Sequence, residues 1–308
     1  MRIGALGRGT TFAEIAANVE ANRAGGYSSV WFSDGIGMDP LTLIGALGRS
    51  VPDIELGTAV VRTLPRHPMT LAQQALTANA LIGGRLALGI GPSHKPAVES
   101  GWGLSFDKPI SRLREYLAIL CPLVAGQAVD YHGERHSAVG ELRIEGGPGF
   151  PVLVAALGPQ MLRLSGRLAD GTVTTMAGPR TLVGDICPTI REAAERHGRP
   201  VPRVVSTLSV CVTDDVGAAR ERAERGVRRM ASLPSYAALL EREGGPALLA
   251  GGEDDLDEAV AALDRAGVTD LLPISIAQRG TDDAERTASW LRLLLARGDR
   301  ADQRSPRR

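Results

Sequence analysis

The stretch GRLALGIGPSHKP, at residues 84–96, decides between two kinds of fold. A dinucleotide-binding loop requires the pattern G-x-G-x-x-G at a strand-to-helix turn, with an acidic residue about 20 positions later. Here Gly89 and Gly91 lack a third glycine at that spacing, and Pro92 removes an amide hydrogen where a phosphate would need one. We therefore interpret the stretch as the end of a barrel strand and exclude a nucleotide loop.

The strand within this stretch alternates between large and small side chains. Because successive residues of a strand point to opposite sides, one face carries Leu86, Leu88 and Ile90, and the other carries Ala87, Gly89 and Gly91. The small face either lets a planar ring lie against the mouth of a barrel or fills a tapering barrel interior. The strand alone leaves both interpretations open.

Short apolar runs of this kind alternate with helical periodicity along the whole chain, which is typical of a parallel sheet with crossover helices. Strands are predicted at residues 2–6, 29–33, 54–61, 85–90, 152–156, 172–175, 204–212 and 271–276. Helices are predicted at 12–24, 41–48, 70–81, 111–123, 161–168, 182–197, 216–230 with 256–266, and 284–296. Eight such units favour a single (β/α)8 TIM-like barrel, of class α/β, over an open doubly wound sheet.

Three intervals between the predicted elements are long. Residues 92–109 are predicted to form an irregular insertion after strand four, and residues 129–149 a hairpin before strand five. Residues 231–253 form either a lid-like segment or a surface excursion. We predict one barrel domain at 1–297 and a disordered, arginine-rich tail at 298–308.

The composition narrows the range of partners. The chain has 308 residues, 44% of them hydrophobic, and its 35 basic residues balance 35 acidic ones. No bulk charge favours nucleic acid or a membrane surface, no window is apolar enough for a membrane span, and no secretion signal opens the chain. Three widely spaced cysteines suit reduced thiols and suggest no metal site. We expect a cytoplasmic protein that acts on a small-molecule substrate. A homodimer is one assembly that this protein could form.

Several motifs resemble the bacterial luciferase-like superfamily of flavin-dependent enzymes. They are RHP at 66–68, LAQQA at 71–75, GRL at 84–86 and GIG at 89–91, together with SSVWFSD at 28–34 and GRLADGT at 166–172. The resemblance covers most of the chain and is strongest to the branch that uses the deazaflavin coenzyme F420. It implies a TIM-like barrel that holds a flavin or deazaflavin at the carboxyl ends of its strands.

The resemblance also implies roles for residues at the ends of strands two and three. Asp34 matches an acidic residue near the ring or the substrate, although Gly35 stands where many deazaflavin members have a histidine. Ala59 and Val60 match a non-proline cis peptide bond behind the ring. Arg62 is expected to face the site or the anionic part of the cofactor.

Further cofactor contacts are expected after strands four and five. Gly91 and Ser93 match positions beside the ring, and His94 matches an acidic residue close to the reacting centre, where an imidazole gives or takes a proton near neutral pH. The cofactor phosphate is expected at Gly158 and at the backbone N–H groups of Gln160 and Met161, which open a helix.

The resemblance predicts an F420-dependent oxidoreductase that transfers a hydride between C5 of the deazaflavin and a small organic substrate. One alternative is a monooxygenase of the same superfamily that uses reduced FMN. A second alternative, kept open by Gly35, is a non-catalytic flavin-binding relative.

Overall fold

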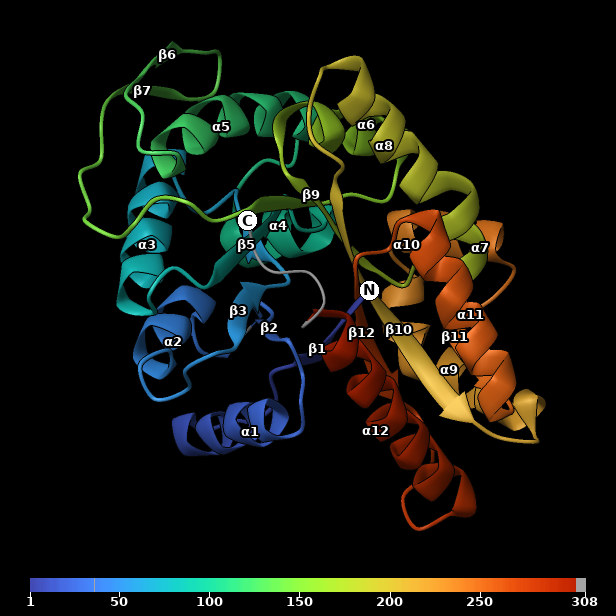
Figure 1. Cartoon of the computed structure of the whole chain (residues 1–308). Helices are drawn as coiled ribbons and strands as arrows, with labels where there is room; N and C mark the ends of the chain where they lie inside the picture. The colour runs from blue at the N-terminus through green and yellow to red at the C-terminus, as the bar shows by residue number, and fades with distance from the viewer. Residues whose placement is uncertain (36, 303–308) are drawn as a thin grey trace.

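Eight parallel strands close into a barrel in the computed structural model, which describes residues 1–35 and 37–302 (Figure 1). The strands are β1 (Arg2–Leu6), β2 (Ser29–Phe32), β3 (Glu55–Thr58), β5 (Leu86–Gly91), β8 (Val152–Ala155), β9 (Gly171–Thr175), β10 (Arg203–Val212) and β12 (Asp270–Ser275). Strand β12 pairs with both β10 and β1, so the sheet has no open edge at this point. The predicted TIM-like barrel is confirmed.

Helices cover the outside of the barrel (Figure 1). They are α1 (Phe12–Ala24), α2 (Pro40–Leu47), α3 (Pro68–Leu81), α4 (Lys95–Trp102), α5 (Pro109–Val124), α6 (Pro159–Leu168), α7 (Pro179–Thr181), the π-helical turn η1 (Leu182–Ile186), α8 (Cys187–Arg196), α9 (Val216–Ala231), α10 (Pro234–Glu243), α11 (Glu253–Ala266) and α12 (Asp282–Asp302). Local signals set their starts. Thr11 caps α1 by accepting the Glu14 N–H at 3.2 Å, and His67 Nδ1 accepts the Met69 N–H at the start of α3.

The third predicted strand is divided at its carboxyl end. Strand β3 stops at Thr58, and the chain resumes as β4 (Val61–Arg62), which pairs with β5. The peptide bond between Ala59 and Val60, at the division, is cis, as predicted.

The interval predicted to be an irregular insertion contains helix α4. Pro96 lies in its first turn, where a missing N–H costs little, and Gly103 ends it in the left-handed conformation with φ of 64°. The proline and glycine that suggested irregular chain are therefore the start and stop of a short helix. The predicted hairpin at 129–149 is confirmed as β6 (Val129–His132) and β7 (Ser137–Gly140).

The segment 231–253, for which the sequence left a lid-like segment and a surface excursion open, contains α10 and β11 (Leu248–Gly251). Strand β11 pairs only with the second half of β10, whereas β9 pairs with the first half of β10. At the carboxyl end of the chain, α12 continues into the segment 298–308 that was expected to be a tail. Residues 303–308, for which disorder is predicted, lie outside the described residues.

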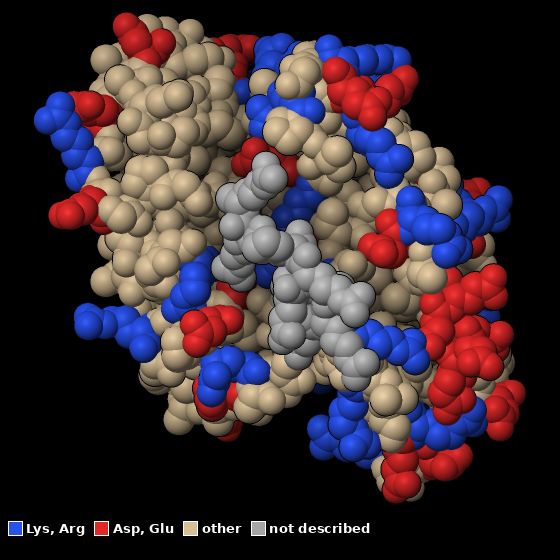
Figure 2. Space-filling view, viewed as in Figure 1, with Lys and Arg blue, Asp and Glu red and all other residues tan. Residues whose placement is uncertain are grey.

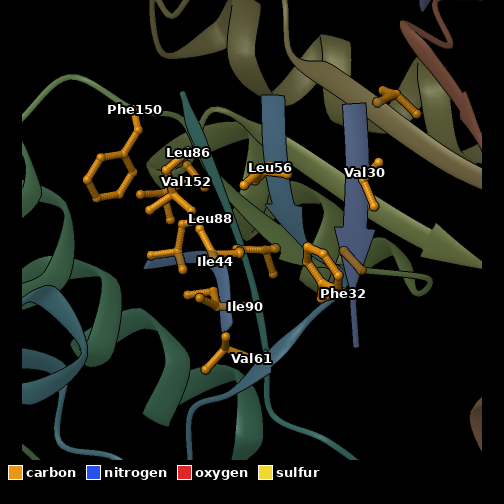
Figure 3. Close-up of a cluster of buried hydrophobic side chains, with 14 of the residues drawn as sticks. Val30, Phe32, Ile44, Leu56, Val61, Leu86, Leu88, Ile90, Phe150 and Val152 are labelled. Atoms are coloured by element: carbon orange, nitrogen blue, oxygen red, sulfur yellow. The ribbon is translucent and has the colours of Figure 1, made fainter. Parts of the chain in front are cut away.

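The hydrophobic core has an outer and an inner layer. Leu86, Leu88 and Ile90 pack outward against the helices, together with Val30 and other strand residues (Figure 3). The inner layer fills the barrel with Trp31, Ala87, Leu153, Val173, Val205 and Leu272. The predicted alternation of β5 is thus confirmed, with its small face inside.

The small face of β5 makes room for the chain itself. A Cβ atom at Gly89 would lie 2.0 Å from the Thr58 carbonyl oxygen, and one at Gly91 would lie 3.0 Å from Val60 Cγ2. The Thr58 hydroxyl also donates to the Gly89 carbonyl at 2.7 Å and accepts the Gly89 N–H at 2.9 Å. The two glycines therefore allow the β3–β4 division to enter the barrel and place Val60 against β5.

Charged residues close the amino-terminal end of the barrel. Arg203 contacts Asp270 at 2.6 Å and Glu55 at 2.6 Å, while Arg2 contacts Glu55 at 3.2 Å. The Asp270 side chain is 1% exposed, and the Arg203 guanidinium lies 5.3 Å from the centre of the Trp31 ring. In (β/α)8 barrels the amino-terminal end of the strands contributes to stability, and the carboxyl-terminal end holds the active site.

The face of the molecule in Figure 2 carries both basic and acidic residues, and the chain has 35 of each. Across the described residues, no helix is long and apolar enough to cross a membrane.

Candidate active site

A cavity of about 420 Å³ opens at the carboxyl ends of the strands. Gly91, Ala155 and Thr175, which end β5, β8 and β9, form part of its wall. Seven of the residues predicted for the site line it, namely Ala59, Val60, Gly91, Ser93, His94, Gly158 and Met161. Residues from three separate loops thus meet at the end of the barrel where parallel barrels place their sites.

The floor of the cavity is apolar. Val60 lies over the glycines of β5, and Val173 and Ala155 extend the surface across β9 and β8. Directly below lie Trp31 and the rest of the inner core layer. An apolar floor of this kind can pack against one face of a ring system and exclude water from beneath it.

His94 stands on the wall of the cavity. It is the residue before α4 and makes no side-chain capping hydrogen bond, so its imidazole is not used to start the helix. Its ring centre lies 5.0 Å from that of Tyr236, which approaches from the start of α10. Burial lowers the pKa of His94 below its usual value of 6.5. The imidazole is therefore neutral at pH 7 and can accept a proton.

Ser93, beside His94, has a left-handed backbone with φ of 68°. This conformation is uncommon for a residue other than glycine, and it occurs in the turn Pro92–His94, whose three residues all line the cavity.

The first turn of α6 supplies hydrogen-bond donors at the edge of the cavity. Gly158 precedes the helix and Pro159 opens it. The N–H groups of Gln160 and Met161 belong to the first turn, where no intrahelical acceptor exists, and among the described residues neither N–H has another backbone acceptor. Met161 faces the cavity, whereas the exposed Gln160 side chain lies outside it. The backbone of this turn can bind an anion, and the Gln160 side chain is not part of the cavity wall.

Asp34 and Arg62 do not line the cavity. The Asp34 carboxylate, 6% exposed, accepts hydrogen bonds from the Arg62 backbone at 3.0 Å, the Arg62 guanidinium at 2.8 Å and the Arg66 guanidinium at 2.7 Å. Burial tends to raise the pKa of Asp34, but these hydrogen bonds outweigh it and hold the pKa below its usual value. Asp34 is thus a fixed anion that joins β2 to β4, and its predicted acid/base role stays a prediction.

Arg62 is occupied by other contacts as well. Its guanidinium donates to the Gly35 carbonyl at 2.9 Å and lies 5.1 Å from the centre of the Trp102 ring at the end of α4. The residue that replaces the expected histidine, Gly35, therefore takes part through its backbone. Contact between Arg62 and a cofactor likewise stays a prediction.

Sequence reasoning missed part of the cavity wall. Phe106 comes from the α4–α5 connection and Pro109 from the start of α5. Leu157 follows β8, Thr175 ends β9, and Tyr236 comes from α10. The strand-end rule applied to β8 and β9 would have found Leu157 and Thr175. No local pattern marks Tyr236, because its approach depends on how α10 folds back. The described residues contain no group of three metal-ligating side chains.

A (β/α)8 barrel with its cavity at the carboxyl ends of the strands has the arrangement in which enzymes of this fold place their active sites. The family model described as luciferase-like monooxygenase matches residues 2–287, and the chain belongs to this family. It is 30% identical to an F420-dependent glucose-6-phosphate dehydrogenase of Nakamurella multipartita over 71% of this chain and 68% of that protein.

Two solved structures show the same fold. The F420-dependent tetrahydromethanopterin reductase of Methanopyrus kandleri superposes with a TM-score of 0.76 at 20% identity, over 95% of this chain and 96% of that one. The EDTA monooxygenase of Chelativorans sp. BNC1 also has a TM-score of 0.76, at 16% identity, over 97% of this chain and 94% of that one. The fold is therefore common to deazaflavin reductases and to monooxygenases.

Proposed function

We propose that this protein is an F420-dependent oxidoreductase that transfers a hydride between the deazaflavin and a small organic substrate. The observation that carries the proposal is the cavity, in which an apolar floor, a neutral imidazole and free amides of α6 meet. The F420-dependent activity named for a relative at 30% identity supports this cofactor.

The residues present fit such a cofactor. The floor formed by Val60 and Val173 suits one face of a fused ring, and the turn at Gly158–Met161 offers amide donors to a phosphate. When bound, the deazaflavin supplies two-electron hydride chemistry at C5, and the protein supplies orientation and a dry environment.

We assign the proton-handling role to His94. Its neutral imidazole, buried beside Tyr236, would hold or accept the proton of a substrate hydroxyl as hydride leaves the same carbon, or return it in the reverse direction. Tyr236 and Phe106 border this part of the cavity and exclude water from it. Alcohols and carbonyl compounds are the substrates that need such a group.

The second candidate is a monooxygenase that uses reduced FMN, favoured by the equally similar fold of the EDTA monooxygenase. Both ligands are tested by titration against the intrinsic fluorescence of Trp31, which lies beneath the cavity, and Trp102, which lies beside Arg62. We expect F420 to bind with micromolar affinity, corresponding to about −8 kcal/mol, and FMN to bind more weakly. Tighter binding of FMN would replace the first proposal by the second.

A further inference from the structure

The last residue of α10, Glu243, joins this helix to the start of α7, and the two helices lie side by side (Figure 1). The Glu243 carboxylate accepts the Arg180 N–H at 3.1 Å, the Thr181 N–H at 2.8 Å and the Thr181 hydroxyl at 2.6 Å. Both N–H groups belong to the first turn of α7, where a helix offers them no acceptor of its own. One side chain thus supplies the missing acceptors and fixes α10 to the helix that follows β9.

Gly178, the residue before α7, leaves room for this carboxylate. A Cβ atom at Gly178 would lie 2.3 Å from Cδ of Glu243. The backbone of Gly178 has φ of −85°, which other residues adopt without strain, so its conformation alone does not require glycine. The start of α7 is therefore shaped to receive Glu243, and an alanine at position 178 would displace the carboxylate.

Tyr236 lies on the same face of α10 as Glu243. Seven positions separate the two residues, which is nearly two turns of an α-helix. Leu239 and Leu240, three and four positions after Tyr236, belong to this face too. Leu239 is fully buried, and both Tyr236 and Leu240 pack against the hydrophobic core. One continuous face of α10 is thus turned to the barrel, with Tyr236 near its beginning and Glu243 at its end.

At the amino end of this face, Tyr236 covers His94. The two ring centres lie 5.0 Å apart, and the ring planes are tilted by 53°. Burial lowers the pKa of His94, and the other titratable side chains of the cavity wall are Lys95, which follows His94 at the start of α4, and Tyr236 itself. The cover over His94 therefore depends on where α10 lies.

Other contacts at the carboxyl end of α10 do not replace Glu243. Arg242 lies 3.4 Å from Asp185, and these side chains are 39% and 49% exposed, so the pair contributes little. Arg220 donates to the Gly244 carbonyl just after α10, which joins this end to α9 and not to α7.

We propose that Glu243 is a positioning residue, which holds α10 against the barrel so that Tyr236 covers His94. The catalytic meaning of the inference rests on the proposed function, in which His94 handles the proton. Its geometric part concerns this chain alone and is tested without a cofactor.

The pKa of His94, followed by NMR of the five histidines in the full-length protein, tests the proposal. The His94 signal is the one that disappears in His94→Ala. Glu243→Ala should release α10, admit water to the imidazole and raise the pKa of His94 toward its ordinary value of 6.5. Removal of a negative charge alone acts in the opposite direction, because a nearby anion favours the protonated imidazole. A rise therefore reports the loss of cover.

Two further variants separate the steps of the argument. Gly178→Ala displaces the Glu243 carboxylate without removing any charge, and it should raise the pKa of His94 as well. Tyr236→Ala uncovers His94 directly and should also raise this pKa. Adding Glu243→Ala to Tyr236→Ala should then cause no further rise, because Glu243 acts through Tyr236.

The matched control is Glu241→Ala, which removes an exposed glutamate from the same helix and should leave the pKa of His94 unchanged. An unchanged or lowered pKa in folded Glu243→Ala would overturn the proposal, and so would an equal rise in the control. Circular dichroism establishes folding, and Gly178→Ala decides in the same way if Glu243→Ala does not fold.

Failure of the proposed function gives a different result, in which F420 does not bind to the unsubstituted protein. The NMR comparison is made without F420 and still decides whether Glu243 positions Tyr236. Normal F420 binding, together with a pKa of His94 that does not respond to Glu243→Ala, would refute the positioning role and leave the proposed function standing.

Discussion

At the scale of single residues, His94 offers the most direct test of the chemistry. Replacing His94 by alanine should lower turnover at least tenfold, because general acid/base catalysis typically raises a reaction rate by about 10²- to 10⁴-fold. The affinity for F420 should stay nearly unchanged. Because burial lowers the pKa of His94, kcat/KM of the unsubstituted enzyme should fall as the pH drops through a value below 6.5. The variant should lack this limb of the pH profile.

The matched control for His94→Ala is His132→Ala on the β6–β7 hairpin, where the side chain is 73% exposed. It should leave both turnover and the pH profile unchanged. Equal activity of His94→Ala and the unsubstituted enzyme would exclude a catalytic role for His94, and lost affinity with normal turnover would assign it to cofactor binding.

A second prediction at this scale concerns Gly89, which lies within the stretch of residues 84–96. Gly89→Ala would place a methyl group 2.0 Å from the Thr58 carbonyl oxygen and should lower the free energy of unfolding by about 1–3 kcal/mol. Gly226→Ala, inside α9 with open space around it, should raise it by about 0.5–1 kcal/mol. Urea denaturation of both variants checks the contrast, and a stable Gly89→Ala protein would contradict the close packing of Thr58.

Residue identities predicted much of the site but not its internal fit. The family motifs identified Val60, His94 and Gly158, and all three line the cavity. The small face that includes Gly89 was predicted from strand alternation, but the reason for a glycine there is the nearby backbone of Thr58 and the side chain of Val60, which no local pattern shows. Asp34 was predicted from its place at a strand end, which does not reveal that two arginines hold its carboxylate.

At the scale of elements, Asp34 ties together segments that are distant in the sequence. Asp34→Asn would leave Arg62 and Arg66 without their charged partner and should lower the free energy of unfolding by about 1–3 kcal/mol at pH 7. Since the fold lowers the pKa of Asp34, its stabilisation is present above the unfolded carboxyl's pKa and is lost as the pH falls through the lowered value. The difference between the two proteins should therefore narrow below about pH 4.

Thermal or urea unfolding across this pH range measures the effect. Asp130→Asn, whose side chain is 77% exposed, is the control and should show little change at any pH. A pH-independent difference for Asp34→Asn would mean that the carboxylate stabilises the fold through shape and not through charge.

Element prediction succeeded where the periodic pattern was long and failed where elements were short. The eight barrel strands were all predicted, and most of their residues are buried in the structure. Strand β11 was missed because its four residues are only half buried and pair with one half of β10. Helix α4 was missed because its proline and glycine resemble loop signals when the helix between them is one or two turns long.

At the scale of the whole molecule, the two ends of the barrel separate stability from binding. Arg203→Met would leave Asp270, 1% exposed, without its main partner, and should lower the free energy of unfolding by about 3–5 kcal/mol. F420 affinity should stay nearly unchanged in the folded variant, because the cofactor cavity lies at the opposite end of the strands. A tenfold loss of affinity with intact secondary structure would show that the two ends are coupled.

The segment that carries α10 has a consequence for how such enzymes diversify. It brings Leu233, Pro234, Ser235 and Tyr236 to the cavity, yet it is attached to the barrel through β10 and β11 on either side. The strand ends that form the floor belong to other parts of the chain. Evolution can therefore exchange this segment as a cassette and alter the choice of substrate without rebuilding the cofactor floor, and a chimera that grafts the segment from a relative should inherit the donor's substrate preference.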